Sequence, residues 1–283
     1  MIIIFLFITL LQEVKGNEIT NGRCGYDCRW EIDENNHMRI YGSGLMGEWK
    51  SETEVPWNSE KERIISVTLE DSITNIGSYS FASCISMETI SISNSVTSIG
   101  VNAFKKCESL KEITIPSSVT TIKGGVFSYC KSLKEVIIPS TVTQLETGSM
   151  FYESSLEHLT FEGDVESLGW NMFYNGCYLK TLHFKGNVNK ARSQVFWNCN
   201  YLPSVIYEGT TIPTNGDESF VNPELFAIVE SSYPGDTFLG LPVLKKESNG
   251  QINLSGSCGT SCTFTLEAIS GEMIVQGSGS IGS

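Results

Sequence analysis

A phenylalanine recurs at almost constant intervals through the middle of this 283-residue chain, and this repeat constrains the fold more than any other feature. Successive members are 22 to 24 residues apart: Phe81, Phe104, Phe127, Phe151, Phe173, Phe196 and, less regularly, Phe220. One unit, starting at Leu110, reads L-x-x-I-x-I-P-x-x-V-x-x-I-x-x-x-x-F-x-x-C-x-x-L. A coil of this length cannot bury its own apolar edge, so such coils stack into a solenoid. The repeat predicts six regular coils and a degenerate seventh, with the phenylalanines stacked along the core.

The alternation within each unit indicates how a coil is built. Ile113-Thr114-Ile115 predicts a short strand with one face buried and one exposed. Pro116 and Pro139 follow their strands, where the missing N–H group lets ladder pairing stop. The spacing Ala103-Phe104-x-x-Cys107 predicts one helical turn on the opposite side. A period in the twenties headed by L-x-x-[IL]-x-[IL] is typical of leucine-rich repeats. The predicted fold class is therefore a leucine-rich-repeat solenoid, mainly β with short helical turns and a concave face of parallel strands.

Five of the nine cysteines belong to the repeat: Cys84, Cys107, Cys130, Cys177 and Cys199. Stacked about 4.8 Å apart, with parallel in-register Cβ vectors, they have poor geometry for disulfide formation. Cysteine is also a common small buried residue. We therefore expect a ladder of reduced, buried thiols rather than a metal or redox site.

The two ends of the chain resemble each other. Residues 22–47 and 256–282 share C-G-x-x-C, an alternating strand, a polar turn, a second strand and G-S-G-x-x-G. The alignment matches Trp30 with Phe264, Met38 with Met273 and Ile40 with Val275. Each motif predicts a β-hairpin, and the first is expected to cap the solenoid core with Trp49 and Trp57.

These end motifs contain two further features. The disulfide candidates are Cys24 with Cys28 and Cys258 with Cys262, and two pairs of free thiols are the alternative. G-x-G-x-x-G also matches the dinucleotide fingerprint, but no βαβ context surrounds either copy. We interpret these glycines as turn residues.

The first sixteen residues predict export. Ile2 to Leu11 is an apolar run with Thr9 as its one polar residue, followed by Val14-x-Gly16 as a cleavage sequence. A membrane anchor, the alternative, needs about 20 apolar residues. The predicted protein is thus secreted or on the cell surface, with no membrane anchor in this chain. Asn253-Leu254-Ser255 is a glycosylation candidate at Asn253.

The predicted domain organisation has five parts. They are a signal peptide at 1–16, a hairpin cap at 17–62, the solenoid at 63–209, a degenerate last repeat with an exit strand at 210–250, and a second hairpin module at 251–283. The last part is either a small closing module or the beginning of a longer tandem arrangement.

Charge and motifs disfavour two function classes. The formal charge of −13 would repel nucleic acid. Three histidines occur without H-E-x-x-H, and neither G-x-S-x-G nor a P-loop is present. We therefore predict a protein that is not an enzyme and needs no cofactor.

The repeat unit, preceded in order by C-G-x-x-C-x-W-x-I-D, G-S-G-x-M and P-W, resembles the BspA-like leucine-rich-repeat surface antigens. The resemblance covers residues 22 to about 245 and the module at 253–283. Members are exported proteins of bacteria and parasitic protists, implicated in adhesion to host matrix proteins, host cells or other microbes. The resemblance implies an adhesin-like binding protein. Many protist members end in a transmembrane helix that is not seen here. A secreted or a truncated member of the family is therefore an alternative to a surface-anchored one.

The outward strand positions suggest where a partner binds. The N-terminal coils present mostly small hydroxyl groups, whereas later coils present a mixed set that we call the late-coil patch: Ile137, His158, Thr160, His183 and Lys185. We predict that an extracellular protein or glycan binds there. A structural coat or spacer protein, with this variation being ordinary drift between repeats, is the alternative.

Two further hypotheses concern this surface. His158 and His183 lie on adjacent coils at an expected diagonal of about 7–8 Å, which would make binding pH-sensitive. A metal site, with Glu135 as a third ligand, is less favoured because no convergent set is evident. A convex aromatic surface is the other candidate for recognition: Trp170, Tyr174, Tyr178 and Trp197.

Overall fold

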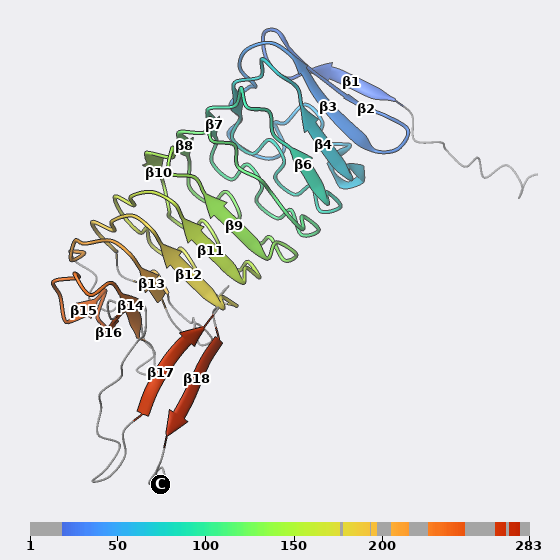
Figure 1. The fold of residues 1–283 in the computed structure, drawn as a ribbon. Coiled ribbons are helices and arrows are strands. Elements are labelled where there is room, and N and C mark those ends of the chain that lie inside the picture. Colours follow the sequence, from blue (N-terminus) through green and yellow to red (C-terminus); the bar gives the residue numbers. More distant parts are fainter. Residues whose placement is uncertain are drawn as a thin grey trace, which may run out of the picture.

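The computed structural model describes residues 19–175, 178–192, 194–196, 205–214, 226–246, 264–269 and 272–277. Over these residues the chain winds through stacked coils whose strands pair side by side (Figure 1). The predicted solenoid is confirmed. Several sequence predictions lie outside the described residues: the signal peptide at 1–16, Cys177, Trp197, Cys199, Phe220, Asn253, Cys258 and Cys262.

The N-terminal hairpins supply the first strands of the solenoid sheet. β1 (Thr20–Arg23), β2 (Cys28–Ile32) and β3 (His37–Gly42) pair antiparallel in chain order. β3 then pairs in parallel with β4 (Ser66–Leu69), and β4 with β6 (Thr89–Ser91). The register sets Met38 against Val67 and Ile40 against Leu69, so the hairpin caps the core by extending its buried rows.

A second sheet runs through the later coils. β9 (Glu135–Ile138), β11 (His158–Phe161), β12 (Thr181–Phe184), β13 (Val205–Tyr207), β14 (Ala227–Val229) and β16 (Leu241–Lys245) are parallel neighbours. β15 (Thr237–Phe238) forms a hairpin with β16. We call the outer side of this sheet and of β4 and β6 the strand face, which is the face predicted to be concave.

The sheet extends further than the sequence predicts. The sequence predicts one exit strand within residues 210–250, but β14 and β16 are two further parallel strands of the same sheet. β14 keeps the alternation of the repeat, with Ala227 and Val229 buried and Ile228 facing outward. It can therefore stack on β13 even though the intervening sequence has lost the period.

A second ladder joins the coils at another edge. β5 (Asn75–Ile76), β7 (Ser98–Ile99), β8 (Thr121–Ile122) and β10 (Gln144–Leu145) are short parallel strands in consecutive coils. In later coils, isolated bridges join Val165 with Val188 and Leu168 with Ala191. Coils whose strands also pair on the strand face are thus held together on two sides.

The helical turn predicted at residues 103–107 is wrong. Among the described residues the one helix is η1, a 3-10 turn at Lys61–Arg63. The amide of Phe104 donates to Val126 O of the next coil at 3.1 Å, whereas Lys105 N–H donates back to Asn102 O at 3.1 Å. Asn102 and Lys106 have φ of 54° and 60°. In an α-helix the amides donate to carbonyl groups within the same helix, whereas in these consecutive turns every second amide donates to the neighbouring coil.

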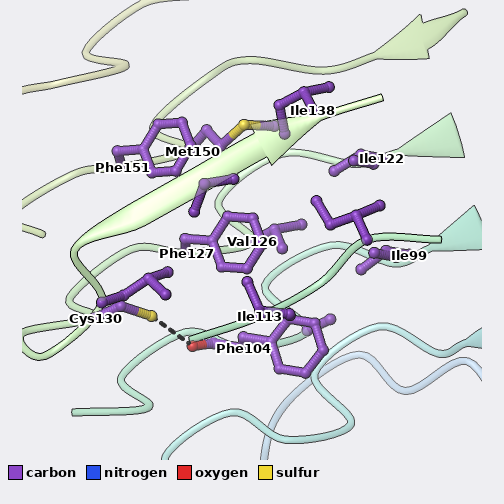
Figure 2. Close-up of a cluster of buried hydrophobic side chains, with 14 of the residues drawn as sticks. Ile99, Phe104, Ile113, Ile122, Val126, Phe127, Cys130, Ile138, Met150 and Phe151 are labelled. Carbon is purple, nitrogen blue, oxygen red and sulfur yellow. Dashed lines mark hydrogen bonds between the residues drawn. The ribbon is translucent and has the colours of Figure 1, made fainter. Parts of the chain in front are cut away.

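The phenylalanine column forms the centre of the core, as predicted. Phe104 lies 5.6 Å from Phe81 and 5.9 Å from Phe127, centroid to centroid, with interplanar angles of 9° and 5°. Figure 2 shows this column with Phe151 and the aliphatic rows beside it. All members through Phe196 are buried. Offset stacking of this kind adds to the free energy gained from burying the rings.

Three repeat cysteines lie within the described residues, and all three are buried free thiols: Cys84, Cys107 and Cys130. Cys107 Sγ donates to Phe81 O at 3.1 Å. Cys130 Sγ likewise donates to Phe104 O at 3.2 Å (Figure 2). Burial raises the pKa of Cys84 and of Cys130 to about 12. These thiols act as small buried side chains, as expected from their place in the repeat.

The strand face is interrupted between β6 and β9. The sequence predicts a strand at 113–115, but residues 111–116 pair with neither neighbour as a strand. In later coils the ladder includes the bonds from Glu162 N–H to Ile138 O and from Lys185 N–H to Phe161 O, both 2.9 Å. Pro116 and Pro139 occupy the position of those donors and have no N–H group. Two consecutive coils therefore lack the hydrogen bond that the residue directly after the strand donates to the preceding coil.

The coils separate only on this side. At the other edge β8 pairs with both β7 and β10, and the Phe104–Phe127 stack is continuous. Ile113 and Ile115 also remain buried. The interruption is consequently a local opening in the strand face of a solenoid whose core is closed.

The two end motifs are both hairpins but differ in register. β17 (Phe264–Ile269) pairs antiparallel with β18 (Glu272–Gly277). In the first hairpin Trp30 is opposite Ile40, whereas in the second Leu266, and not Phe264, is opposite Val275. The connection between strands is shorter in the second hairpin, so the match of Phe264 with Trp30 does not hold.

The first motif is closed by a bond between Cys24 and Cys28, whose Cα atoms are 5.0 Å apart. Gly42 and Gly44, interpreted as turn glycines, have φ of 100° and 79°. A Cβ on Gly42 would lie 2.1 Å from Asp27 O. A glycine is therefore required there by both conformation and space.

Candidate functional site

The late-coil patch is built from three adjacent strands of the strand face. The register sets Ile137 of β9, Thr160 of β11 and His183 of β12 side by side in one row. His158 lies in the next row, between Glu135 and Thr181. Lys185 directly follows β12. Since period-2 alternation places every second side chain outward, these five residues share one surface.

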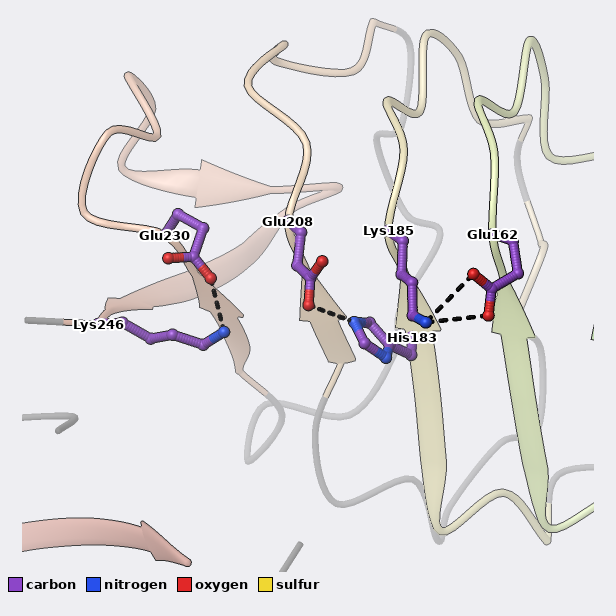
Figure 3. Close-up of polar contacts among 6 residues, drawn as sticks. All are labelled: Glu162, His183, Lys185, Glu208, Glu230 and Lys246. Atoms are coloured by element: carbon purple, nitrogen blue, oxygen red, sulfur yellow. Dashed lines mark hydrogen bonds and ion pairs between the residues drawn. The ribbon is translucent and has the colours of Figure 1, made fainter. Parts of the chain in front are cut away.

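The two histidines of the late-coil patch bind different partners. His183 Nε2 lies 2.8 Å from Glu208 Oε1 (Figure 3). His158 Nδ1 lies 2.8 Å from Thr181 Oγ1. Each imidazole is therefore oriented by a neighbour on the following coil, and the structure gives no contact between the two rings.

Two glutamates complete the patch, and sequence reasoning left them out of it. Lys185 Nζ lies 2.9 and 3.1 Å from the two carboxylate oxygens of Glu162, and Glu208 holds His183 (Figure 3). Glu162, Lys185 and Glu208 recur 23 residues apart in one column. That alternation of charge at the repeat spacing was the signal for a row of ion pairs.

Further ion pairs join neighbouring coils along the same face. Lys111 Nζ lies 2.6 Å from Glu88 and Lys246 Nζ 2.6 Å from Glu230. Glu157 lies between Lys134 at 3.0 Å and Lys180 at 2.5 Å. Hydrogen bonds from Lys180 and then Lys134 lower the pKa of the Glu157 carboxyl to about 2. These four lysines and Lys185 are thus already neutralised.

A pocket of about 670 Å³ opens where the ladder is interrupted. We call it the inter-coil pocket: it is lined by residues of 111–117 on one side and of 134–140 on the other, with Glu162 at its border. Ile137, a residue that is 47% exposed, belongs both to this pocket and to the late-coil patch. The patch is therefore a surface with a hollow at its N-terminal end.

The charge at the pocket is acidic. Glu112 and Glu135 occupy equivalent positions in consecutive coils and are both exposed. Neither has an ion pair within the described part of the chain, whereas Lys111 and Lys134 are paired with Glu88 and Glu157. The uncompensated charge beside Ile137 is therefore negative.

The structure offers no metal centre among the residues it describes: no three His, Cys, Asp or Glu side chains are grouped so that they could hold an ion. Glu135 is opposite His158 in register, but His183 is directed to Glu208 instead. The one helix in the described ranges, η1, has three residues, so none of the helical structure seen there could span a bilayer.

The alternative aromatic surface is partly used for packing. Tyr174 stacks on Tyr152 with centroids 5.1 Å apart, and Tyr152 lies 5.4 Å from Tyr129. Trp170 and Tyr178 are exposed, and Trp170 lies under the Arg192 guanidinium at 6.0 Å. The tyrosines therefore join consecutive coils, as expected if this surface is structural.

Comparison with solved structures gives leucine-rich-repeat proteins of low sequence identity. A leucine-rich repeat protein of Eubacterium ventriosum is 17% identical, with 81% of this chain and 86% of that chain covered and a TM-score of 0.44. A leucine-rich cell surface protein of Faecalibacterium prausnitzii is 21% identical, covering 74% and 76%, with a TM-score of 0.39. The leucine-rich repeat protein of T. pallidum is 18% identical, covering 71% and 84%, also at 0.39.

The family is established by the sequence itself. No match was found among curated proteins. The family model of the BspA type leucine rich repeat region matches six copies, over residues 59–175 and 147–229. These ranges cover more than half of the chain and contain the strands from β4 to β14. The chain belongs to the BspA-type leucine-rich repeat family.

Proposed function

We propose that this chain is an exported, non-enzymatic binding protein, an adhesin-like surface antigen that recognises a host or microbial protein or glycan through the late-coil patch. The observation that carries the proposal is the row Ile137–Thr160–His183, presented in register on three adjacent strands beside the inter-coil pocket. Rigid rows of side chains on an extended sheet suit a large partner better than a metabolite.

The geometry of the patch supports specific recognition. His183 and Lys185 are held by Glu208 and Glu162, so their side chains lose little freedom when a partner binds. Ile137 supplies an exposed apolar contact between charged neighbours. An apolar centre with a polar rim is the usual arrangement of a protein interface.

Export is part of the same proposal. The apolar run at Ile2 to Leu11 supports a signal peptide, and the Cys24–Cys28 bond is of a kind that persists outside the reducing cytosol. We expect the mature chain to begin near Asn17 and to be secreted or held at the cell surface. Sequencing the N-terminus of the native protein tests this, and an intact Met1 would refute it.

The binding test uses an array of purified extracellular-matrix proteins and glycans, probed with the chain from Asn17 onward. One variant replaces all five residues of the late-coil patch with alanine. A control variant, T68A/T89A/S91A, removes outward hydroxyl groups from the N-terminal coils of the same face. Circular dichroism shows whether each variant is folded. We expect the patch variant to bind an array partner at least tenfold more weakly and the control to bind it normally.

The other outcomes decide between the alternatives. Undiminished binding by a folded patch variant would move the site elsewhere, first to the surface around Trp170. Equal losses in both variants would mean that the whole face, and not the patch, is responsible. The absence of any array partner would favour the structural coat or spacer protein.

A further inference from the structure

The main chain of residues 112–115, here called the unpaired segment, has no backbone hydrogen bond within the described structure. It lies between β6 and β9, and both of those strands pair only on their far edges, with β4 and β11. By contrast, the same positions of β11 and β12 pair along four consecutive residues. The polar groups of the unpaired segment are therefore available to another chain.

The space next to this segment is large enough to be occupied. The inter-coil pocket, about 670 Å³, is lined by Glu112, Thr114 and Ile115 on one side and by Glu135, Ile137 and Pro139 on the other. It therefore exposes the unpaired segment and the free edge of β9 together. An exposed strand edge binds an extended peptide by main-chain hydrogen bonds, while neighbouring side chains select its sequence.

The side chains of the pocket indicate which sequence would fit. Glu112 and Glu135 are exposed and carry no ion pair in the described ranges, and the neighbouring Lys111 and Lys134 are neutralised by Glu88 and Glu157. Ile137 offers an apolar surface between the two coils. Electrostatic complementarity therefore favours a basic side chain on the occupant, with an apolar one beside it.

We infer that the inter-coil pocket binds an extended, basic peptide segment of a partner protein, which adds to the unpaired segment as a strand. The inference rests on the proposed function and narrows its partner to a protein with an exposed extended segment. Lysine or arginine of that segment pairs with Glu112 and Glu135, and an alternate apolar residue packs on Ile137.

The test uses a defined peptide, acetyl-KVKVKV-amide, with the full chain from Asn17 onward. Binding is followed by amide hydrogen exchange at residues 111–117 and 134–140. One control peptide, EVEVEV, reverses the charge, and another carries an N-methyl group on every backbone amide and cannot donate along either edge. We expect KVKVKV to slow exchange at least tenfold in both ranges. The two control peptides are expected to leave the exchange rates unchanged.

Two protein variants separate the main-chain and charge contributions. P116T/P139T restores both N–H groups, so the ladder closes and KVKVKV should no longer slow exchange. E112Q/E135Q should weaken KVKVKV binding at least fivefold. The control E108Q/E166Q removes two exposed carboxylates outside the pocket, of which Glu166 is paired with Lys190, and should bind the peptide normally.

Several results would overturn the inference: no slowing by KVKVKV, equal slowing by the N-methylated peptide, or unchanged binding by a folded P116T/P139T variant. Equal loss in E108Q/E166Q and E112Q/E135Q would show only attraction to an acidic protein, which also overturns it. These failures differ from failure of the proposed function. If the protein binds an array partner through the late-coil patch but does not bind KVKVKV, the proposed function stands and the peptide site is refuted.

Discussion

Trp57 lies directly against Phe81, with ring centroids 6.0 Å apart and an interplanar angle of 28°. The indole Nε1 donates to Ser80 O at 2.8 Å in the buried core. Trp30 and Trp49 pack edge-on against the same indole at 5.9 and 5.4 Å. The first coil is therefore closed by a ring that continues the phenylalanine column into the cap.

We expect Trp57→Ala to lower the free energy of unfolding by about 3–5 kcal/mol, because it opens the end of the core. Trp57→Phe keeps a stacked ring but leaves Ser80 O without its donor, and should cost about 1 kcal/mol for the lost hydrogen bond. Urea denaturation of the two variants measures both values. Equal losses in the two would contradict a role for the ring in closing the core.

Phe127 tests the column itself. It is buried between Phe104 and Phe151, with centroids 5.9 and 5.7 Å away. Phe127→Ala should cost about 3–5 kcal/mol. Tyr152→Ala is the matched control, because Tyr152 stacks on Tyr174 at 5.1 Å but is only half-buried. The control should lose clearly less stability, and a larger loss in Tyr152→Ala would contradict the packing argument.

The repeat thiols are expected to be unreactive in the native protein. The raised pKa values, about 12 for Cys84 and Cys130, leave on the order of one thiolate in ten thousand molecules at pH 8. Iodoacetamide should therefore leave these two residues unmodified until urea unfolds the chain, while a small-molecule thiol added as an internal control reacts within minutes. Rapid labelling of Cys84 in the folded protein would refute the buried ladder.

Glu157 should give the strand face a distinct acid response. Its pKa is lowered to about 2, so the carboxylate stabilises the fold at pH values above its unfolded pKa of about 4. That contribution is lost as the pH falls from about 4 through 2. The stability difference between the protein and E157Q should accordingly shrink over this range and vanish below pH 2. A difference that stays constant between pH 5 and 2 would show that the ion pairs with Lys134 and Lys180 do not stabilise the fold.

Residue periodicity was sufficient to predict the stacking. The 23-residue spacing of Phe81, Phe104 and Phe127 fixes which rings meet, since each coil must bury the same face. The outward rows followed for the same reason, because alternation within a strand assigns Ile137, Thr160 and His183 to one side. Both depend only on repetition and burial.

Other features depend on backbone bonds that leave little trace in the sequence. Asn102 and Lys106 adopt a left-handed conformation without being glycine, so the spacing of Phe104 and Cys107 resembled a helical turn. Residues 113–115 keep the alternation of a strand although they pair with none, and only Pro116 and Pro139 indicated the interruption. A pocket between two coils could not be predicted from the composition of either.

The recognition mechanism depends most directly on the strand face being open at the unpaired segment. Amide hydrogen exchange of the free protein measures this at single-residue resolution, with His158–Phe161 of β11 as the internal comparison. The expected result is that amides of residues 112–115 exchange at least a hundredfold faster than those of β11, because they have no backbone partner. Equal protection of the two segments would mean that the ladder is continuous from β6 to β9, and would contradict the pocket and the peptide site together.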